Sequence, residues 1–363
     1  MSFSRFLLAA ALALTACSGG GSEYRLGMAG PFTESFGLSN RRGAELALAH
    51  VNADGGINGT PLQIDFRDDG GDGSRAATIA QEFIDDARIS AVVGHVTSGA
   101  MVAAAKVYDG RMAALATTAS SAELTGISRW VFRVISSDSA NGVDLARFAT
   151  EQLGKRRAYV LYENDAYGRG LANAFRRTFG GDVVGVDPID AEGRDAEVFI
   201  DWAATQQVDL VFVAGTERSG LAVLRAARAA GLAADFLGGD GWTGIAADSA
   251  LAEGTYMGAP FTARDPRPEA QRFVEQFRAT YATEPDGNAA LAYDAVMVMA
   301  AALREVGADR AKLREWLAGR TARTPIAGVT GSIAFDRSGD PVGKSHVMTR
   351  VRAGALVPAA EAP

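Results

Sequence analysis

The sequence has one cysteine, Cys17, and only three histidines among its 363 residues. A single cysteine forms no intramolecular disulfide, so the stability of the fold must come from its core. A serine triad needs a histidine, but His50 falls in a predicted helix beside apolar positions and His346 in a predicted terminal strand, where structural roles are expected. His95 ends a predicted strand, and we expect it to provide polar lining for a cleft rather than to act as a base.

The motifs of common enzyme classes are missing too. The sequence has no Gly-x-Ser-x-Gly elbow, no Walker-type phosphate loop, and no His, Cys and carboxylate set at metal-ligand spacing. Two glycine-rich stretches, 70–73 and 238–241, are weak phosphate signals. The adjacent Asp68 and Asp69 are expected to cap a strand end rather than hold a cation. We therefore predict neither an enzyme nor a bound metal or cofactor.

The chain also lacks an excess of positive charge. Its formal net charge is −7, and its Lys and Arg residues are scattered. Nucleic acids and anionic membranes favour a basic patch, so neither is expected as a partner surface. Beyond the N-terminus, no apolar run approaches the roughly 18–20 residues that span a membrane. What the chain does have is length and 48% hydrophobic residues, enough to build two lobes.

The N-terminus has the pattern of an export signal. A cationic start at Arg5 precedes a short apolar run. The tetrad Leu-Thr-Ala-Cys at 14–17 resembles a bacterial lipobox, in which the cysteine is diacylated. We predict a lipoprotein signal peptide at 1–16 and a flexible tether at 17–23, so that the mature protein is periplasmic and anchored to the membrane through Cys17. An ordinary signal peptide that contains a cysteine is the alternative.

From Tyr24 onward, strand-like and helix-like segments alternate. The stretch 62–66 alternates apolar and polar residues as a strand does. The helical pattern before it has Ser39 as its expected N-cap and glycines at 55–56 as its expected stop. A second series of the same kind begins near Ser139. This alternation is typical of parallel sheets with helices on both faces.

The predicted fold is α/β, with two doubly wound parallel-sheet lobes joined by a multi-strand hinge. Late in the chain, the stretches 331–340 and 345–357 are predicted to form an antiparallel strand pair. The predicted division is 24–138 plus 260–337 for the first lobe and 139–259 plus 338–358 for the second.

The loops at the strand ends carry the candidate site. In doubly wound sheets, ligands bind beyond the carboxyl ends of strands, where helix N-termini point their N–H groups. Ser98 and Ser120 suit a ligand carboxylate, and Asp240 suits an ammonium group. Simpler interpretations exist, namely N-capping for the serines and a turn position for Asp240. Their joint placement at strand ends of both lobes favours a site for a small zwitterion.

The same loops resemble a known family, the type I periplasmic substrate-binding proteins of the leucine/isoleucine/valine-binding kind, which serve ABC importers. Each motif is weak alone, whereas the ordered set, with near-family spacing over almost all of the mature chain, is specific. The motifs are "MAGPFTESFG", "VVGHVTSGA", "TTASSAELT", "ENDAYGRGLANAF", "LRAARAAGL" and "AYDAV".

The resemblance implies a role for individual residues. Ser98 and Ser120 would hold the ligand carboxylate. The backbone carbonyl of Thr118 and the side chain of Asp240 would hold its ammonium group, and Tyr167 would close over it from the second lobe. Further positions of the pocket wall are expected at Phe36, Val96 and Thr97.

Two positions depart from the family pattern. Thr216 stands where some members have a tyrosine, and Asn288 stands where a large apolar residue is usual. Trp242, beside Asp240, is expected to fill the lost volume. These changes keep the clamp for the amino-acid backbone but put a branched aliphatic side chain in doubt.

The resemblance implies a monomer whose lobes close on a small amino acid, perform no chemistry, and dock on importer permease subunits. One alternative is the same fold binding an amine-free aromatic or other carboxylic acid. An intracellular ligand-sensing regulator and an exported hydrolase are the others. The export signal and the missing DNA-binding head argue against the regulator, and the residue inventory argues against the hydrolase.

Overall fold

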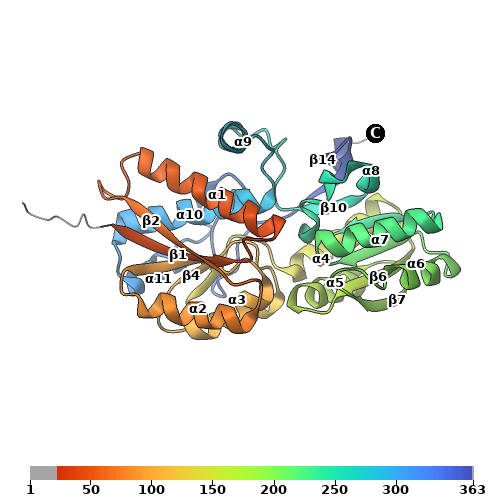
Figure 1. Cartoon of the computed structure of the whole chain (residues 1–363), viewed down its shortest axis with the longest axis horizontal. Helices are drawn as coiled ribbons and strands as arrows, with labels where there is room; N and C mark the ends of the chain where they lie inside the picture. The colour runs from red at the N-terminus through yellow and green to blue at the C-terminus, as the bar shows by residue number, and fades with distance from the viewer. Residues whose placement is uncertain (1–22, 362–363) are drawn as a thin grey trace, which may run out of the picture.

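The computed structural model describes residues 23–361 and has two lobes side by side (Figure 1). The predicted signal peptide, nearly all of the predicted tether, and Cys17 lie outside the described residues. Each lobe is a largely parallel sheet with helices on both faces. The chain passes between the lobes after β5, after β10 and before β13. The predicted fold class is confirmed.

The first lobe has a five-stranded parallel sheet in the order β2-β1-β3-β4-β5. Helices α1, α10 and α11 pack on one face, and α2 and α3 pack on the other. The bounds are β1 Tyr24–Gly30, α1 Ser35–Ala53, β2 Leu62–Asp68, α2 Gly73–Asp85, β3 Ile89–Gly94, α3 Ser98–Tyr108, β4 Ala114–Ala116, β5 Val131–Arg133, α9 Pro268–Tyr281, α10 Gly287–Val306, α11 Arg310–Ala318, β11 Ile326–Gly328 and β12 Gly331–Ile333.

The second lobe has a seven-stranded sheet in the order β14-β13-β10-β9-β8-β6-β7, antiparallel only at β13 and β14. Helices α6, α7 and α8 cover one face, and α4 and α5 cover the other. The bounds are α4 Asp138–Arg147, β6 Arg157–Glu163, α5 Ala166–Thr178, β7 Asp182–Ile189, α6 Ala196–Thr205, β8 Leu210–Ala214, α7 Glu217–Ala230, β9 Asp235–Gly238, α8 Ser249–Ala252, β10 Tyr256–Ala259, β13 Val347–Arg352 and β14 Ala355–Pro358.

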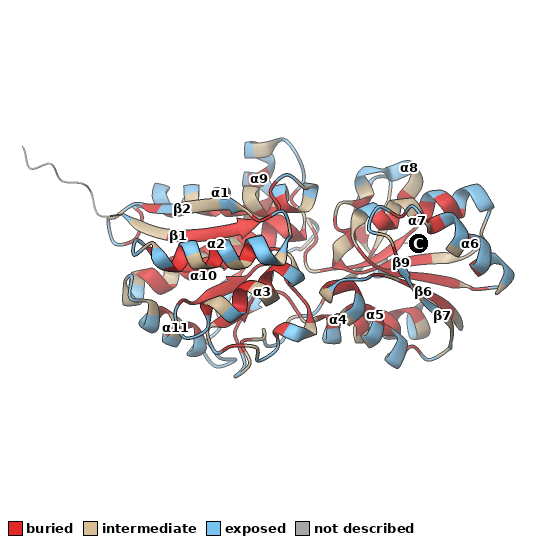
Figure 2. Cartoon of the chain, turned by 60° about the horizontal axis from the view of Figure 1, so that its bottom comes forward, coloured by how far each residue is buried: buried red, intermediate tan, exposed pale blue. Residues whose placement is uncertain are grey.

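Local sequence explains why these elements form where they do. Every residue of β3 is buried, as expected for a strand covered on both faces, and Figure 2 shows buried strands at the centre of each lobe. Aspartates start several helices by accepting the backbone N–H three residues ahead. Asp72 caps α2, Asp165 caps α5 and Asp286 caps α10, at distances of 2.7–2.9 Å.

The predicted N-cap of the first helix is wrong. Helix α1 begins at Ser35, after Glu34, rather than after Ser39. The backbone already turns before this point, since the N–H of Glu34 donates to the carbonyl of Pro31. The Ser39 hydroxyl therefore lies one turn inside the helix, where it donates to Oδ1 of Asp286 at 2.5 Å.

The predicted pairing of 331–340 with 345–357 is also wrong. Strand β12 pairs with β11 instead, and β13 lies between β10 and β14. The sequence shows that both stretches favour strands. The sequence does not show that β13 can pair with β10 of the second sheet, a longer strand than β12. The one antiparallel pair formed within 345–357 is β13 with β14.

The first and third crossings lie against each other. The Ser136 hydroxyl in the first crossing donates to the carbonyl of Lys344 in the third at 2.9 Å. Residues 338–340, which the predicted division assigns to the second lobe, bond to the first: the N–H of Arg133 donates to the Gly339 carbonyl, and its guanidinium pairs with Asp340 at 2.7 Å. The chain therefore leaves the first lobe only after these residues.

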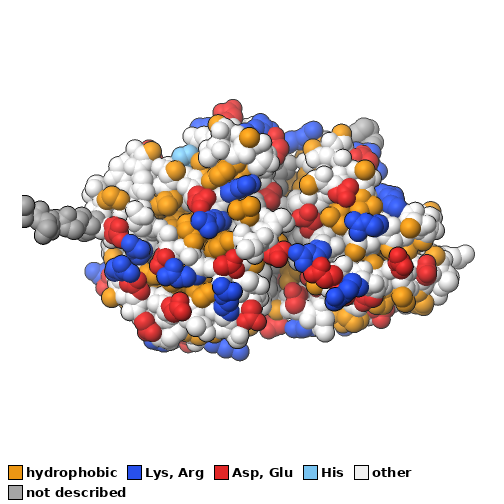
Figure 3. Space-filling view, in the orientation of Figure 1, with side chains coloured by type: hydrophobic (Ala, Val, Ile, Leu, Met, Phe, Trp, Pro, Cys, Tyr) orange, Lys and Arg blue, Asp and Glu red, His pale blue; other side chains and the backbone are white. Residues whose placement is uncertain are grey.

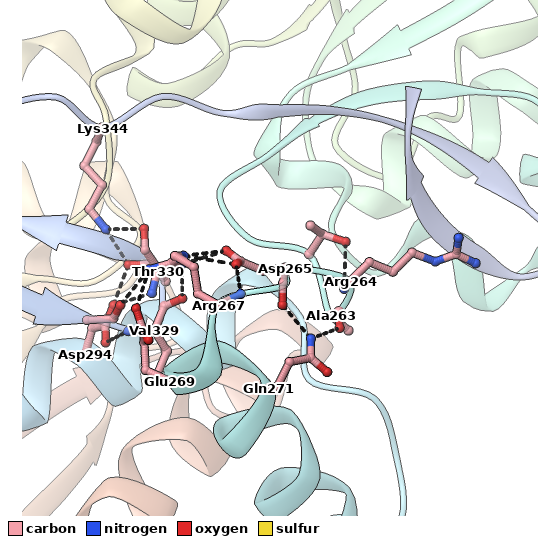
Figure 4. Close-up of polar contacts among 12 residues, drawn as sticks. Ala263, Arg264, Asp265, Arg267, Glu269, Gln271, Asp294, Val329, Thr330 and Lys344 are labelled. Carbon is pink, nitrogen blue, oxygen red and sulfur yellow. Dashed lines mark hydrogen bonds and ion pairs between the residues drawn. The ribbon is translucent and has the colours of Figure 1, made fainter. Parts of the chain in front are cut away.

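A polar cluster also anchors the crossings to the first lobe (Figure 4). The Lys344 ammonium donates to the Thr330 carbonyl at 2.8 Å, and Asp294 of α10 accepts the backbone N–H of Val329 and of Thr330. Arg267, which follows the second crossing, donates to the Val329 carbonyl at 2.7 Å. The turn between β11 and β12 thus ties two crossings to α10.

The face of the molecule seen in Figure 3 carries charges of both signs. Acidic and basic side chains are interspersed over both lobes in the view of Figure 3, in keeping with the modest net charge. Among residues 23–361, no helix has the length and apolar character needed to cross a bilayer. Within the same residues, no group of three or more His, Cys, Asp or Glu side chains is placed to hold a metal ion.

Candidate ligand-binding site

A cavity lies between the lobes at the carboxyl ends of both sheets, with a volume of about 90 Å³. Both lobes contribute to its lining, which is Phe36, Val96, Thr97, Ser98, Thr118 and Asn288 from the first lobe and Asp165, Tyr167, Thr216, Asp240 and Gly241 from the second.

Eight of the ten predicted ligand-binding residues line this cavity, and Ser120 and Trp242 do not. Asn288, predicted as a wall position, also lines it. Asp165 and Gly241 were not among the predicted residues. Both lie in strand-end loops, and Asp165 immediately precedes the helix that carries Tyr167, which is the signal that could have indicated it.

Ser98 is the first residue of α3 and is almost fully buried. Its Oγ accepts the backbone N–H of Ser120 at 3.2 Å and of Ser121 at 3.1 Å. Because two donors already point at this oxygen, its own proton is left for an acceptor in the cavity. The N-terminus of α3 adds a favourable dipole for an anion. The residue is thus built to donate to a carboxylate.

Ser120 lies one step behind the cavity. Its N–H is bonded to Ser98, and its carbonyl accepts from the guanidinium of Arg133 and from the N–H of Asp138, each at 2.8 Å. Ser120 does not line the cavity in this closed form, but its hydroxyl is buried without a hydrogen-bond partner among residues 23–361, so its contact with a ligand stays a prediction. These tertiary bonds hold the loop so that Thr118, two residues earlier, faces the cavity instead.

Thr118 contributes two acceptor atoms. Its hydroxyl donates to the carbonyl of Val96 at 2.9 Å, so this hydroxyl presents only its lone pairs to the cavity. In the described part of the chain, no protein donor bonds to its backbone carbonyl, the group expected to accept from an ammonium. Asn40, fully buried behind it, reaches the Thr118 hydroxyl only at 3.4 Å.

On the facing lobe, Asp240 follows β9 and points one carboxylate oxygen at protein donors. Its Oδ1 accepts from Asn141 at 3.0 Å and from the Tyr167 hydroxyl at 3.2 Å. The Tyr167 hydroxyl in turn accepts the N–H of Gly241 at 2.9 Å. No donor among residues 23–361 bonds to Oδ2. That oxygen is the acceptor left for a ligand cation.

Burial raises the pKa of Asp240 to about 6. A second buried carboxyl, Asp138 at the start of α4, has its pKa raised further by burial and by the nearby charge of Asp240. Two carboxyl groups this close share an unfavourable charge when both are ionised. A ligand cation beside Asp240 relieves this repulsion, so the pair favours an ammonium group.

The role predicted for Trp242 is wrong. The indole is fully buried in the core between β9 and α7. A Cβ atom at Gly220 would lie 2.5 Å from the indole, and a Cβ atom at Gly238 would lie 2.1 Å from it, so both glycines are needed to leave a slot for the ring. The volume lost at Thr216 and Asn288 is consequently not filled by this tryptophan.

The predicted role of His95 is wrong as well. The side chain is fully buried, with Nδ1 2.7 Å from a carboxylate oxygen of Asp69 and Nε2 3.0 Å from the Tyr108 hydroxyl. It binds α3 to the loop after β2 and does not line the cavity. His50 and His346 are structural too: His50 bonds to the Tyr293 hydroxyl at 3.0 Å, and His346 is buried.

The lobes touch directly around the cavity, so the structure is a closed form. The Ser121 hydroxyl donates to the carbonyl of Ala166 at 3.1 Å. On the other side, Arg218 of α7 pairs with Glu34 at 2.7 Å. Both pairs join segments of different lobes and are made only when the lobes are together.

The comparisons with known proteins agree with this architecture. The family described as "Periplasmic binding protein" matches residues 25–355. The leucine-, isoleucine-, valine-, threonine- and alanine-binding protein of Pseudomonas aeruginosa is 30% identical over 331 residues, covering 87% of this chain and 86% of the relative.

Solved structures agree as well. An ABC transporter substrate-binding protein from Desulfitobacterium hafniense, in complex with Leu, has a TM-score of 0.80 at 32% identity and covers 92% of this chain and 99% of its own. A branched-chain amino acid transporter substrate-binding protein from Streptococcus pneumoniae, in complex with isoleucine, has a TM-score of 0.83 at 26% identity, with 92% and 97% covered. The chain belongs to the periplasmic binding protein family, among the proteins of the leucine/isoleucine/valine-binding kind.

Proposed function

We propose that this protein is an extracytoplasmic solute-binding protein that captures a small free amino acid between its lobes and delivers it to an ABC importer. One observation carries the proposal: Ser98 on one lobe and Asp240 on the other face a single cavity with opposite preferences. Ser98 offers a proton and a helix N-terminus to an anion, and Asp240 offers an unpaired carboxylate oxygen to a cation. A zwitterion satisfies both.

The proposed cycle is binding and closure without chemistry. The ligand first meets Ser98 and Thr118 on the first lobe. Closure then brings Asp240 and Tyr167 against its ammonium group and forms the contacts of Ser121 with Ala166. The closed form presents a composite surface of both lobes, which the importer's permease subunits would recognise. No catalytic step, cofactor or metal enters this cycle.

An amine-free carboxylic acid is the second candidate, and the site argues against it. Such a ligand would bury Asp240 beside Asp138 without supplying a cation. An unpaired buried charge is costly, so Asp240 would have to take up a proton. The Ser98 end of the site suits any carboxylate and does not discriminate. Asp240 is the residue that distinguishes an amino acid from an amine-free acid.

Calorimetry tests the proposal directly. The purified mature protein is titrated with a panel of L-amino acids and with their amine-free analogues. We expect at least one amino acid to bind and its amine-free analogue to bind more than tenfold more weakly. Equal binding of the two would refute the zwitterion site. Absence of binding by every amino acid would refute the proposed function.

We further propose that the protein acts as a monomer and is held at the membrane by a diacylglyceryl group on Cys17. The lipobox-like tetrad at 14–17 supports the anchor. Mass spectrometry of the protein extracted from membranes tests it: the N-terminal peptide should begin at Cys17 and carry the lipid. A mature form that begins at another residue, without lipid, would rule the anchor out.

A further inference from the structure

The side-chain half of the cavity is rich in hydrogen-bond acceptors, and this points to the class of amino acid that fits. We infer that the preferred ligand carries a hydrogen-bond donor on its side chain, a hydroxyl, amide or ammonium, and is not purely aliphatic. The inference rests on the proposed function and specifies its ligand.

Two of the three threonines that line the cavity, Thr118 and Thr216, face it from opposite lobes and present lone pairs to it. The Thr118 hydroxyl donates to the carbonyl of Val96 at 2.9 Å. The Thr216 hydroxyl donates to Oε1 of Glu163 at 2.7 Å, an atom that also accepts the N–H of Thr216 at 2.8 Å. Since both protons are already directed at protein acceptors, each hydroxyl can only accept from a ligand.

The remaining lining repeats this bias. Asp165 and Asp240 are carboxylates, and no Lys, Arg or His is part of the lining. The N–H of Gly241 is already bonded to Tyr167, so it is not offered to a ligand. Asn288 presents an amide, the Thr97 hydroxyl has no partner among the described residues and can donate or accept, and Ser98 is arranged as the donor for the ligand carboxylate. The ligand's ammonium group donates to Asp240, so the other acceptors of the lining are left without a donor.

The cavity leads toward further acceptors. Phe36, Thr97 and Thr216 also line a second, more open cavity between the lobes, which Glu163 and Glu217 border. Burial raises the pKa of Glu217, and its only hydrogen bond in the described structure comes from the Ser35 hydroxyl at 3.3 Å. Arg218 lines this cavity too, but it already pairs with Glu34 and Glu192. A ligand side chain directed past Phe36 therefore approaches a lining in which carboxylates outnumber cations.

An aliphatic side chain would bury these acceptors without partners. A buried polar group that loses water and gains no hydrogen bond is the main source of discrimination between ligands of equal shape. Phe36 and Val96 still offer apolar contact to the ligand's methylene and methyl groups. The expected selectivity therefore depends on the polar atom of the ligand side chain. Pairs of amino acids with the same shape measure the effect of that atom alone.

The test is calorimetry on the purified mature protein with three matched pairs: threonine and valine, asparagine and leucine, lysine and 2-aminoheptanoic acid. We expect the polar member of at least one pair to bind about tenfold or more tightly than its apolar match. If the apolar member binds as well or better in all three pairs, the inference is overturned and the proposed function stands. If no member of any pair binds although another amino acid does, the inference is likewise overturned, and if no amino acid binds at all, the proposed function itself fails.

Two variants assign the preference to residues. Thr216→Val and Asn288→Leu keep the approximate volume and remove an acceptor each. We expect either change to reduce the ratio of polar to apolar affinity by about tenfold, with the apolar ligand retained or improved. Thr280→Val on the exposed face of α9, far from the cavity, is the matched control and should leave the ratio unchanged. An unchanged ratio in both cavity variants would overturn the assignment, and the two are made separately because Thr216 also bonds to Glu163.

Discussion

The hydroxyl of Tyr167 donates to Oδ1 of Asp240 at 3.2 Å and accepts the N–H of Gly241 at 2.9 Å. The tyrosine therefore fixes the acidic side chain and the loop that carries it in a single contact. Because Asn141 bonds to the same oxygen, Oδ2 is the atom left to the cavity. This asymmetry of one carboxylate is the basis of the first three predictions.

Replacing Asp240 with asparagine should weaken amino-acid binding by tenfold to over a hundredfold. The change keeps the shape and removes the charge that pairs with the ligand ammonium group, and charged hydrogen bonds are worth about 1.5–3 kcal/mol. Calorimetry gives the dissociation constants. Asp201→Asn, an exposed position on α6, is the control and should bind as the parent does. Full affinity in Asp240→Asn would show that the ammonium is held elsewhere.

The affinity should depend on pH through the same residue. Its pKa in the ligand-free protein is raised to about 6, and the ammonium binds the ionised form. Below that pH the carboxyl must first lose a proton, so binding at pH 5 should be about tenfold weaker than at pH 7. Asp138 faces Asp240, and burial together with the charge of Asp240 raises its pKa as well. The dependence should vanish in Asp240→Asn, and a flat profile in the parent would contradict the prediction.

Tyr167→Phe should keep the aromatic surface but lose the bond to Asp240 and the acceptor for Gly241. The hydroxyl stabilises the ionised carboxylate, so its removal should raise the pKa of Asp240 further. We expect affinity to fall by about three- to tenfold at pH 7 and the pH profile to move to higher pH. Reduced affinity with an unmoved profile would mean that the ring contributes by contact alone.

Ser98→Ala should weaken both binding and folding. The change removes the donor to the ligand carboxylate and leaves the backbone N–H groups of Ser120 and Ser121 without their acceptor. Buried N–H groups without a partner cost about 1–3 kcal/mol, which urea denaturation without ligand would detect. Ser98→Thr keeps the hydroxyl and should retain most of the stability. A loss of affinity in Ser98→Ala without any loss of stability would show that the loop does not depend on this bond.

The cluster at the crossings should give stability its own pH dependence. Burial lowers the pKa of Lys344 to about 8, below the 10.5 of an ordinary lysine. Between these values the unfolded chain binds more protons at this residue than the folded chain does, so its contribution to stability rises with pH from about 8 to 10.5. Comparison with Lys344→Met by urea denaturation isolates this contribution. The difference in unfolding free energy between parent and variant should move in the parent's favour over this range, and a constant difference would contradict the assignment.

The sequence by itself determined the architecture and most of the cavity lining. Alternating strand and helix patterns specify two covered parallel sheets, because a strand buried on both faces and an amphipathic helix each leave a local signature. In such a fold the loops after strands converge at one edge. Ser98 and Asp240 could therefore be assigned to one site from their positions in strand-end loops, whereas Tyr167 is assigned through the family resemblance.

Only the tertiary structure decided which way side chains in those loops face. The backbone of Ser120 lies behind the cavity, since its N–H bonds to Ser98, 22 residues earlier, and its carbonyl bonds to Arg133. Trp242 leaves the cavity because Gly220 and Gly238, on two other elements, open a slot in the core. Local sequence patterns do not show which residues of distant segments these side chains and loops will contact. Hydrogen bonds and packing between distant segments set these directions, and they exist only once the chain has folded.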